Sequence, residues 1–186
     1  RSDSAMSYAF SKKALLAASA YGLLRLVVIS LDEATPLLMS IPRAAGGLDF
    51  NTSDIGLALF GQGLLLILHV LIIYPNLKKW FGTLQLYKFA CILIPLVCCV
   101  LPFLADVYDL MSRTLFWALL EFYMFVKVFS CSMGFTSVTI LINNSAPQHV
   151  IGTVNGFSQM AASFTSMIAP SLAGSLFTWS LKNSLP

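Results

Sequence analysis

The sequence has 186 residues, of which 58% are hydrophobic and only 10% are charged, with a formal net charge of +3. An ordinary soluble domain carries about 25% charged residues, and a chain this short cannot hide so much apolar surface inside a water-soluble fold. Composition therefore excludes a soluble globular domain and indicates a membrane protein. The basic residues do not form the clusters that nucleic-acid binding needs, so no nucleic acid is expected as a partner.

Five apolar stretches are long enough to cross a bilayer, which takes about 20 mainly apolar residues in a helix. In chain order they cover residues 14–40, 55–74, 86–104, 114–142 and 154–177. The connections between them are short, as is usual for neighbouring antiparallel helices. The sequence predicts an all-α, polytopic transmembrane helical bundle of about five spans, formed by residues 1–186 as a single membrane domain.

The charges of the connecting segments indicate the orientation, because Lys and Arg favour the cytoplasmic side. With five spans, the N-terminus shares its side with the second and fourth connections. That side carries six basic residues: Arg1, Lys12, Lys13, Lys78, Lys79 and Lys88. The opposite side carries three: Arg43, Arg113 and Lys182. We therefore expect an integral, multi-pass protein with a cytoplasmic N-terminus, in either a plasma or a vacuolar-type membrane.

Ionisable residues inside the spans are the main candidates for function, since a charge at the bilayer centre costs about 2.5–3.5 kcal/mol on insertion scales. Arg25 lies about 17 Å into the first span and Lys127 about 20 Å into the fourth. Each is expected to face a cavity, an acid or an anionic substrate group. Asp32 and Glu33, near the outer end of the first span, are either solvated residues of a cavity mouth or proton carriers. Glu121 is six residues from Lys127 and points to a different helix face.

No set of residues indicates catalysis or a bound metal. The cysteines all lie inside apolar stretches without zinc-site spacing, and packing explains them. His69 and His149 are isolated, and no nucleophile motif accompanies them. We expect no enzymatic activity, no cofactor and no metal site.

Several segments resemble transporters of the major facilitator superfamily, most closely the fungal drug:proton antiporter type. The cytoplasmic connection and eleventh helix of that family are similar to NNSAPQHVIGTVNGFSQ, at 143–159, followed by MIAPSLAGSLF, at 167–177. The end of the seventh helix and its outer loop are similar to LDEATPLLMSIPRAAGGLDF, at 31–50. The connection of helices eight and nine is similar to IYPNLKKWFGTLQLYK, at 73–88. The resemblance implies a partial major facilitator fold, helices seven to eleven of a twelve-helix transporter.

The resemblance also assigns roles to two further parts of the chain. The cytoplasmic gating loop of the family would contain Lys78, Lys79 and Gly82. Lys79 replaces the acid that usually makes a gating contact there, so that charge switch is not expected in this chain. The fifth span would be a helix at the interface between the two halves of the transporter. Its interface residues would be Gly152, Asn155, Gly156, Pro170 and Gly174.

The resemblance implies that the whole protein transports a small solute by alternating access, with proton coupling. Its partners would be the lipid bilayer, a small-molecule substrate, protons and the missing N-terminal half of the transporter. The alternative is a non-transporting membrane fragment or scaffold. For that alternative we expect poor stability, because Arg25 and Lys127 would lack neighbours from the other half.

Overall fold

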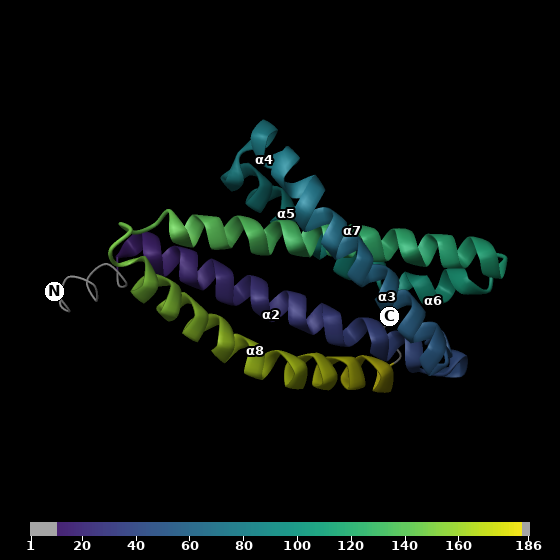
Figure 1. Cartoon of the computed structure of the whole chain (residues 1–186). Helices are drawn as coiled ribbons and strands as arrows, with labels where there is room; N and C mark the ends of the chain where they lie inside the picture. The colour runs from purple at the N-terminus through teal and green to yellow at the C-terminus, as the bar shows by residue number, and fades with distance from the viewer. Residues whose placement is uncertain (1–10, 184–186) are drawn as a thin grey trace.

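The computed structural model describes residues 11–183, and every regular element in that range is helical (Figure 1). Five helical segments are long and apolar enough to cross a membrane: Lys12–Ser40, Thr52–Phe81, Thr83–Val100, Arg113–Asn143 and Ile151–Ser180. The prediction of an all-α membrane bundle with five spans is therefore confirmed. Of the basic residues that indicated the orientation, Arg1 lies outside the described residues.

The first span is helix α2, Lys12–Ser40. Its start is capped by Ser11, whose hydroxyl oxygen accepts a hydrogen bond from the amide of Ala14 at 3.3 Å. This bond satisfies one of the backbone donors that the first turn leaves free. The helix ends before Pro42, which disfavours a helical conformation at Ile41, and the φ and ψ of Ile41 are accordingly -70° and 140°.

The second span is one continuous rod of three helical segments: α3 at Thr52–Leu68, the π-helical turn η2 at His69–Ile73 and α4 at Tyr74–Phe81. The rod continues past the predicted end at residue 74, because Pro75 lies in the first turn of α4, where a missing amide donor costs little. It ends at Gly82, whose φ of 72° favours glycine. Lys78 and Lys79, predicted to lie in a loop, are therefore on a helix.

The third and fourth spans are joined by a short additional helix. The elements are α5 at Thr83–Val100, α6 at Phe103–Tyr108 and α7 at Arg113–Asn143. Helix α5 ends before the predicted residue 104, because the ring of Pro102 and its missing N–H interrupt the helical hydrogen bonds. Helix α7 begins where the hydroxyl of Ser112 accepts a hydrogen bond from the amide of Leu115 at 3.4 Å.

The fifth span is helix α8, Ile151–Lys182, which continues through Pro170. Two side-chain hydrogen bonds hold the turn that precedes α8. The hydroxyl of Ser145 donates to the carbonyl of Ile142 at 2.7 Å, which satisfies a free acceptor at the end of α7. The side-chain amide of Asn155 donates to the side-chain oxygen of Asn143 at 2.8 Å, and this bond links the end of α7 to the start of α8.

Helix α7 is the centre of the bundle, because α2, α3 and α5 all pack on it. Helix α2 also packs along much of α8, and Figure 1 shows these two helices side by side. In the most apolar part of α7, 56% of the residues are buried, against 11% in the second span. The rod of α3 and α4 therefore leaves most of its apolar side chains available to lipid or to another protein.

The end of the bundle at which α2 ends and α7 begins is closed by the side chain of Arg43. Its Nη1 donates to the carbonyl oxygens of Gly47 at 2.9 Å and of Ala105 at 3.0 Å. Its Nη2 forms an ion pair with Asp109, and its guanidinium lies 4.5 Å from the ring centre of Tyr108. We call this set of contacts the Arg43 clamp. It joins the connection between α2 and α3 to α6.

Candidate functional site

The side chain of Lys127 is buried in the middle of the bundle and makes three polar contacts. Its Nζ lies 2.8 Å from Oδ1 of Asp32, 3.2 Å from Oγ1 of Thr35 and 3.4 Å from Oε1 of Gln62. An ammonium group has three N–H donors and no acceptor, so these three oxygens account for all of its hydrogen-bonding capacity. Of the surroundings predicted for Lys127, the structure shows an acid, Asp32, and also a cavity that Lys127 helps to line.

Three helices bring these groups together. Asp32 and Thr35 are three residues apart on α2, so they lie on one face of that helix, one above the other. Gln62 comes from α3 and Lys127 from the centre of α7. The hydroxyl of Thr35 donates to the carbonyl of Leu31 at 2.6 Å, which turns its oxygen lone pairs toward the ammonium.

A cavity of about 140 Å³ lies beside this ion pair. Its walls come from α2, α3 and α7, and its lining residues are Val28, Asp32, Gln62, Leu66, Lys127, Val128, Cys131, Ser132 and Phe135. Mostly apolar walls with a few converging polar groups are typical of small-molecule sites. Within residues 11–183, no three His, Cys, Asp or Glu side chains gather closely enough to hold a metal ion.

The ion pair explains how a charge can be buried at this depth. A Lys at the centre of a membrane helix costs about 2.5–3.5 kcal/mol on insertion scales, unless an opposite charge or a polar group offsets it. The side chain of Lys127 is only 2% exposed, whereas that of Asp32 is 49% exposed. The carboxylate therefore offsets the buried charge of Lys127 and still faces the outside of this chain.

Arg25 forms a second polar contact, between α2 and α8. Its Nε donates to the hydroxyl oxygen of Ser166 at 3.0 Å, and its Cζ lies 5.8 Å from the ring centre of Phe135. The carboxylate of Asp32, seven residues further along α2, is paired with Lys127 and not with Arg25. Arg25 is therefore close to the cavity, because Phe135, which it contacts, forms part of the cavity wall.

Glu33 and Glu121 are not part of the Lys127 network. Glu33 is exposed, and neither acid forms an ion pair within the described range 11–183. The carboxylate of Glu121 lies against Gly61, where an added methyl group would come within 2.7 Å of Oε2. A side chain at position 61 would therefore require the flexible end of Glu121 to move at this point of contact between α3 and α7.

The sequence predicted poor stability of an isolated segment, and the reason given for that prediction is wrong. Arg25 and Lys127 were expected to lack neighbours without the rest of a transporter. Both have partners inside this chain: Ser166 and Phe135 for the arginine, and Asp32 with two neutral oxygens for the lysine. The charge of Lys127 therefore does not by itself require a second half, and Arg25 has neighbours within this chain but no acid.

Four polar residues of this region were not predicted from the sequence: Thr35, Gln62, His69 and Ser132. The Nδ1 of His69 is hydrogen-bonded to the hydroxyl of Ser132, which lines the cavity. The other ring nitrogen, Nε2, is buried without a hydrogen-bond partner among the described residues. The available signal was that Gln62 and His69 interrupt an otherwise apolar run, but no spacing rule shows which helix they face.

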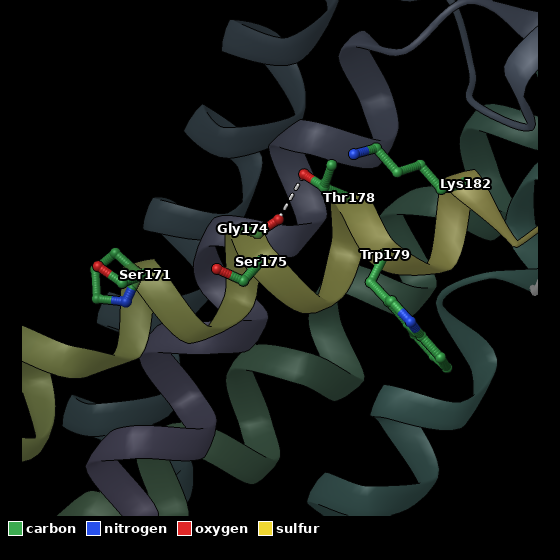
Figure 2. Close-up of a pocket in the computed structure, with 7 residues that line it drawn as sticks. Ser171, Gly174, Ser175, Thr178, Trp179 and Lys182 are labelled. Atoms are coloured by element: carbon green, nitrogen blue, oxygen red, sulfur yellow. Dashed lines mark hydrogen bonds between the residues drawn. The ribbon is translucent and has the colours of Figure 1, made fainter.

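The residues assigned to the transporter interface lie on open surfaces of this chain. A methyl group added at Gly152, Gly156 or Gly174 would meet nothing within 4 Å. Pro170 and Gly174 belong to a shallow groove of about 560 Å³ along α8, together with Ser171, Ser175, Thr178, Trp179 and Lys182. Figure 2 shows that all of these side chains come from one helix. We take the cavity beside Lys127 as the candidate site, because three helices enclose it and a charge pair lines it.

Three similar proteins indicate the kind of protein to which this membrane bundle corresponds. The Major facilitator superfamily multidrug transporter mfsB of Aspergillus fumigatus is 27% identical over 187 residues, which cover 94% of this chain. A Probable peptide/nitrate transporter of Arabidopsis thaliana is 32% identical over 163 residues, or 87% of the chain. Protein ZINC INDUCED FACILITATOR 1, also of Arabidopsis thaliana, is 31% identical over 150 residues, or 80% of the chain.

This chain is similar to transporters of the major facilitator superfamily. The resemblance seen in the sequence motifs is thereby confirmed. The chain spans 30% of the length of the first relative, 33% of the second and 30% of the third. No protein-family model and no solved structure match it.

Proposed function

We propose that the whole protein moves a small solute across a membrane by alternating access, coupled to protons, and that this chain supplies helices seven to eleven of a major facilitator transporter. The observation that carries the proposal is the ion pair between the buried Lys127 and the half-exposed Asp32, beside a cavity between three helices. A charge pair at this depth is expensive to maintain, so a functional role is the default interpretation of it.

Asp32 is the group to which we assign the proton. Its side chain is 49% exposed and that of Lys127 is 2% exposed, so Asp32 is the partner that lies open at the surface of this chain. A proton that binds Asp32 removes its negative charge and ends the ion pair, and the ammonium then keeps two neutral partners, Thr35 and Gln62. The pair thus has two states that differ by one proton, and a coupled transporter needs such a two-state element.

The second half of the transporter would pack on the open faces of α8 and of the α3–α4 rod. Gly152, Gly156 and Gly174 offer a surface without side chains, which permits close approach of another helix in a membrane. Asn155 and Pro170 lie on the same helix. In this arrangement α4, with Lys78 and Lys79, faces the cytoplasm next to Gly82, and the N-terminus is cytoplasmic as well.

Alternating access predicts that a residue in the cavity is reachable from each side of the membrane in turn. The test places a cysteine at Gln62 (Gln62→Cys) in a variant whose four native cysteines are replaced by serine. A membrane-impermeant thiosulfonate is applied to sealed vesicles of both orientations. We expect modification from either side, and faster modification when Asp32→Asn frees the cavity from the ion pair.

The control is a cysteine at Leu71, which is exposed on the α3–α4 rod away from the cavity lining. In lipid, this control should resist the reagent from both sides. Modification of the Gln62→Cys variant from one side alone would contradict alternating access. That result would favour the alternative, a membrane scaffold that does not transport.

A further inference from the structure

Arg25 has most of its hydrogen-bonding capacity unused. A guanidinium carries five N–H donors, of which only the one on Nε has a partner, the Ser166 hydroxyl at 3.0 Å. Within residues 11–183, Nη1 and Nη2 have no hydrogen-bond partner, and no carboxylate forms an ion pair with Arg25. Arg25 is half-buried and these nitrogens are not among the enclosed unpaired atoms of the described chain, so a ligand can reach them.

Arg25, beside the cavity, therefore has no counter-ion among the described residues. Lys127 is neutralised by Asp32 and has no donor left, because its three N–H groups already face three oxygens. Arg25 is the basic residue in the middle of the described spans that no acid of those spans neutralises. A charge at this depth needs an opposite charge or water, and an anionic ligand supplies the first.

The surroundings of Arg25 suit a ligand that combines an anion with an apolar ring. The guanidinium lies over Phe135, with 5.8 Å between Cζ and the ring centre, and the same ring lines the cavity of about 140 Å³. Val28, less than one turn from Arg25 on α2, also lines this cavity. A ligand with an apolar ring in the cavity would thus have Arg25, which contacts the same Phe135 ring, as a neighbouring cation without a counter-ion among the described residues.

We propose that Nη1 and Nη2 of Arg25 bind the anionic group of the transported solute, and that the substrates are organic anions with a sulfonate or carboxylate on an apolar ring. Two parallel N–H donors match two oxygens of such a group, which Lys cannot reproduce. This inference rests on the transport function proposed above and names its substrate class.

The test measures binding of three ring compounds to the whole protein in lipid nanodiscs, by the shift of the thermal unfolding midpoint. Benzenesulfonate carries a permanent negative charge, benzenesulfonamide is a neutral molecule of nearly the same shape, and phenyltrimethylammonium is a cation. We expect benzenesulfonate alone to raise the midpoint. Arg25→Gln should weaken its binding by about tenfold or more, because a charge-assisted pair is lost.

Two further variants make the result specific to the guanidinium. Arg113→Gln removes an exposed arginine at the start of α7 and should leave the shift unchanged. Arg25→Lys keeps the positive charge but lacks the planar guanidinium, and it should give an intermediate shift of the unfolding midpoint. This variant also tests the proposal if Arg25→Gln does not fold. An equal shift with benzenesulfonamide, a larger one with phenyltrimethylammonium, or a full shift in both Arg25 variants would overturn the proposal.

The labelling of the Gln62→Cys variant keeps this inference separate from the transport proposal. Two-sided labelling without any benzenesulfonate shift would leave alternating access intact and would overturn the anion site. In that case, an acid of another protein segment would be the expected partner of Arg25. A benzenesulfonate shift that depends on Arg25, together with one-sided labelling, would leave an anion site in a protein that does not transport.

Discussion

The ion pair of Lys127 and Asp32 is asymmetric, because one partner is enclosed and the other is half-exposed. The lysine side chain is 2% exposed and the aspartate side chain 49% exposed. Removing the carboxylate leaves a buried charge without an anion, whereas removing the ammonium leaves a carboxylate that water can still reach. The two residues are therefore not equivalent for stability, although they make the same contact.

Asp32→Asn is accordingly expected to cost more stability than Lys127→Met. Breaking a buried pair so that a charge stays behind costs about 3–5 kcal/mol, and the double variant, which leaves no charge behind, should be close to wild type or more stable. The free energy of unfolding in mixed micelles with increasing SDS measures all three. A larger loss for Lys127→Met than for Asp32→Asn would show that the carboxylate, not the ammonium, is the costly partner.

The sequence identified both charges of this pair but not their pairing. Depth along a predicted span follows from counting residues, so Lys127 and Asp32 could be selected as functional candidates without a structure. Which helix faces which depends on packing angles between α2, α3 and α7, and no local pattern encodes them. Gln62 was missed for the same reason, since a neutral amide in an apolar run becomes significant only through what it contacts.

At the level of elements, α2 and α8 depend on a small residue where they meet. A methyl group at Gly22 would lie 3.6 Å from Cγ2 of Thr165 and 3.7 Å from the carbonyl oxygen of Ala161, which is ordinary van der Waals contact. A larger side chain has no space between the two helices. Among membrane helices, such small residues let the backbones approach closely.

Gly22→Leu should therefore separate α2 from α8, and Gly22→Ala should be tolerated. We expect a loss of about 1–3 kcal/mol for leucine, the usual cost of overpacking, and a change within about 0.5 kcal/mol for alanine. Gly63→Leu on α3 is the matched control, because a side chain there would meet nothing within 4 Å. Thermal unfolding in the same nanodiscs compares them, and an equal loss for Gly22→Leu and Gly63→Leu would refute the packing argument.

The element boundaries were predictable where local chemistry decides them. Ser11 and Pro42 enclose α2 within two residues of the predicted limits, since caps and prolines act through neighbouring backbone groups. The second span was predicted too short, because its apolar run ends at residue 74, whereas the helix continues through Pro75 to Phe81. The π-helical turn His69–Ile73 delivers the chain to Pro75 in a conformation that a proline accepts, and this geometry leaves no signature in composition.

For the whole molecule, the distribution of basic residues makes a definite prediction about orientation. Six basic residues on one side against three on the other place the N-terminus and α4 in the cytoplasm. Asn76 on α4 and Ser53 at the start of α3 are both exposed, so a cysteine at either position is available to a reagent.

In sealed membrane vesicles with the cytoplasmic face inside, a cysteine at Ser53 should react with a membrane-impermeant maleimide, and a cysteine at Asn76 only after the vesicles are permeabilised. Both substitutions are made in the background without native cysteines, and the background itself serves as the control for unspecific labelling. The reverse labelling pattern would show that all five spans have the opposite orientation.

The Arg43 clamp constrains how such a bundle can deform. Its arginine is held by two carbonyls, a carboxylate and an aromatic ring that belong to two separate connections of the chain. The connection between α2 and α3 cannot move away from α6 unless the three contacts of Arg43 with Ala105, Asp109 and Tyr108 break together. Strain introduced at one of these two connections is consequently transmitted to the other at this end. At the opposite end, α7 and α8 are joined by the short turn of residues 144–150 and by the hydrogen bond between Asn155 and Asn143.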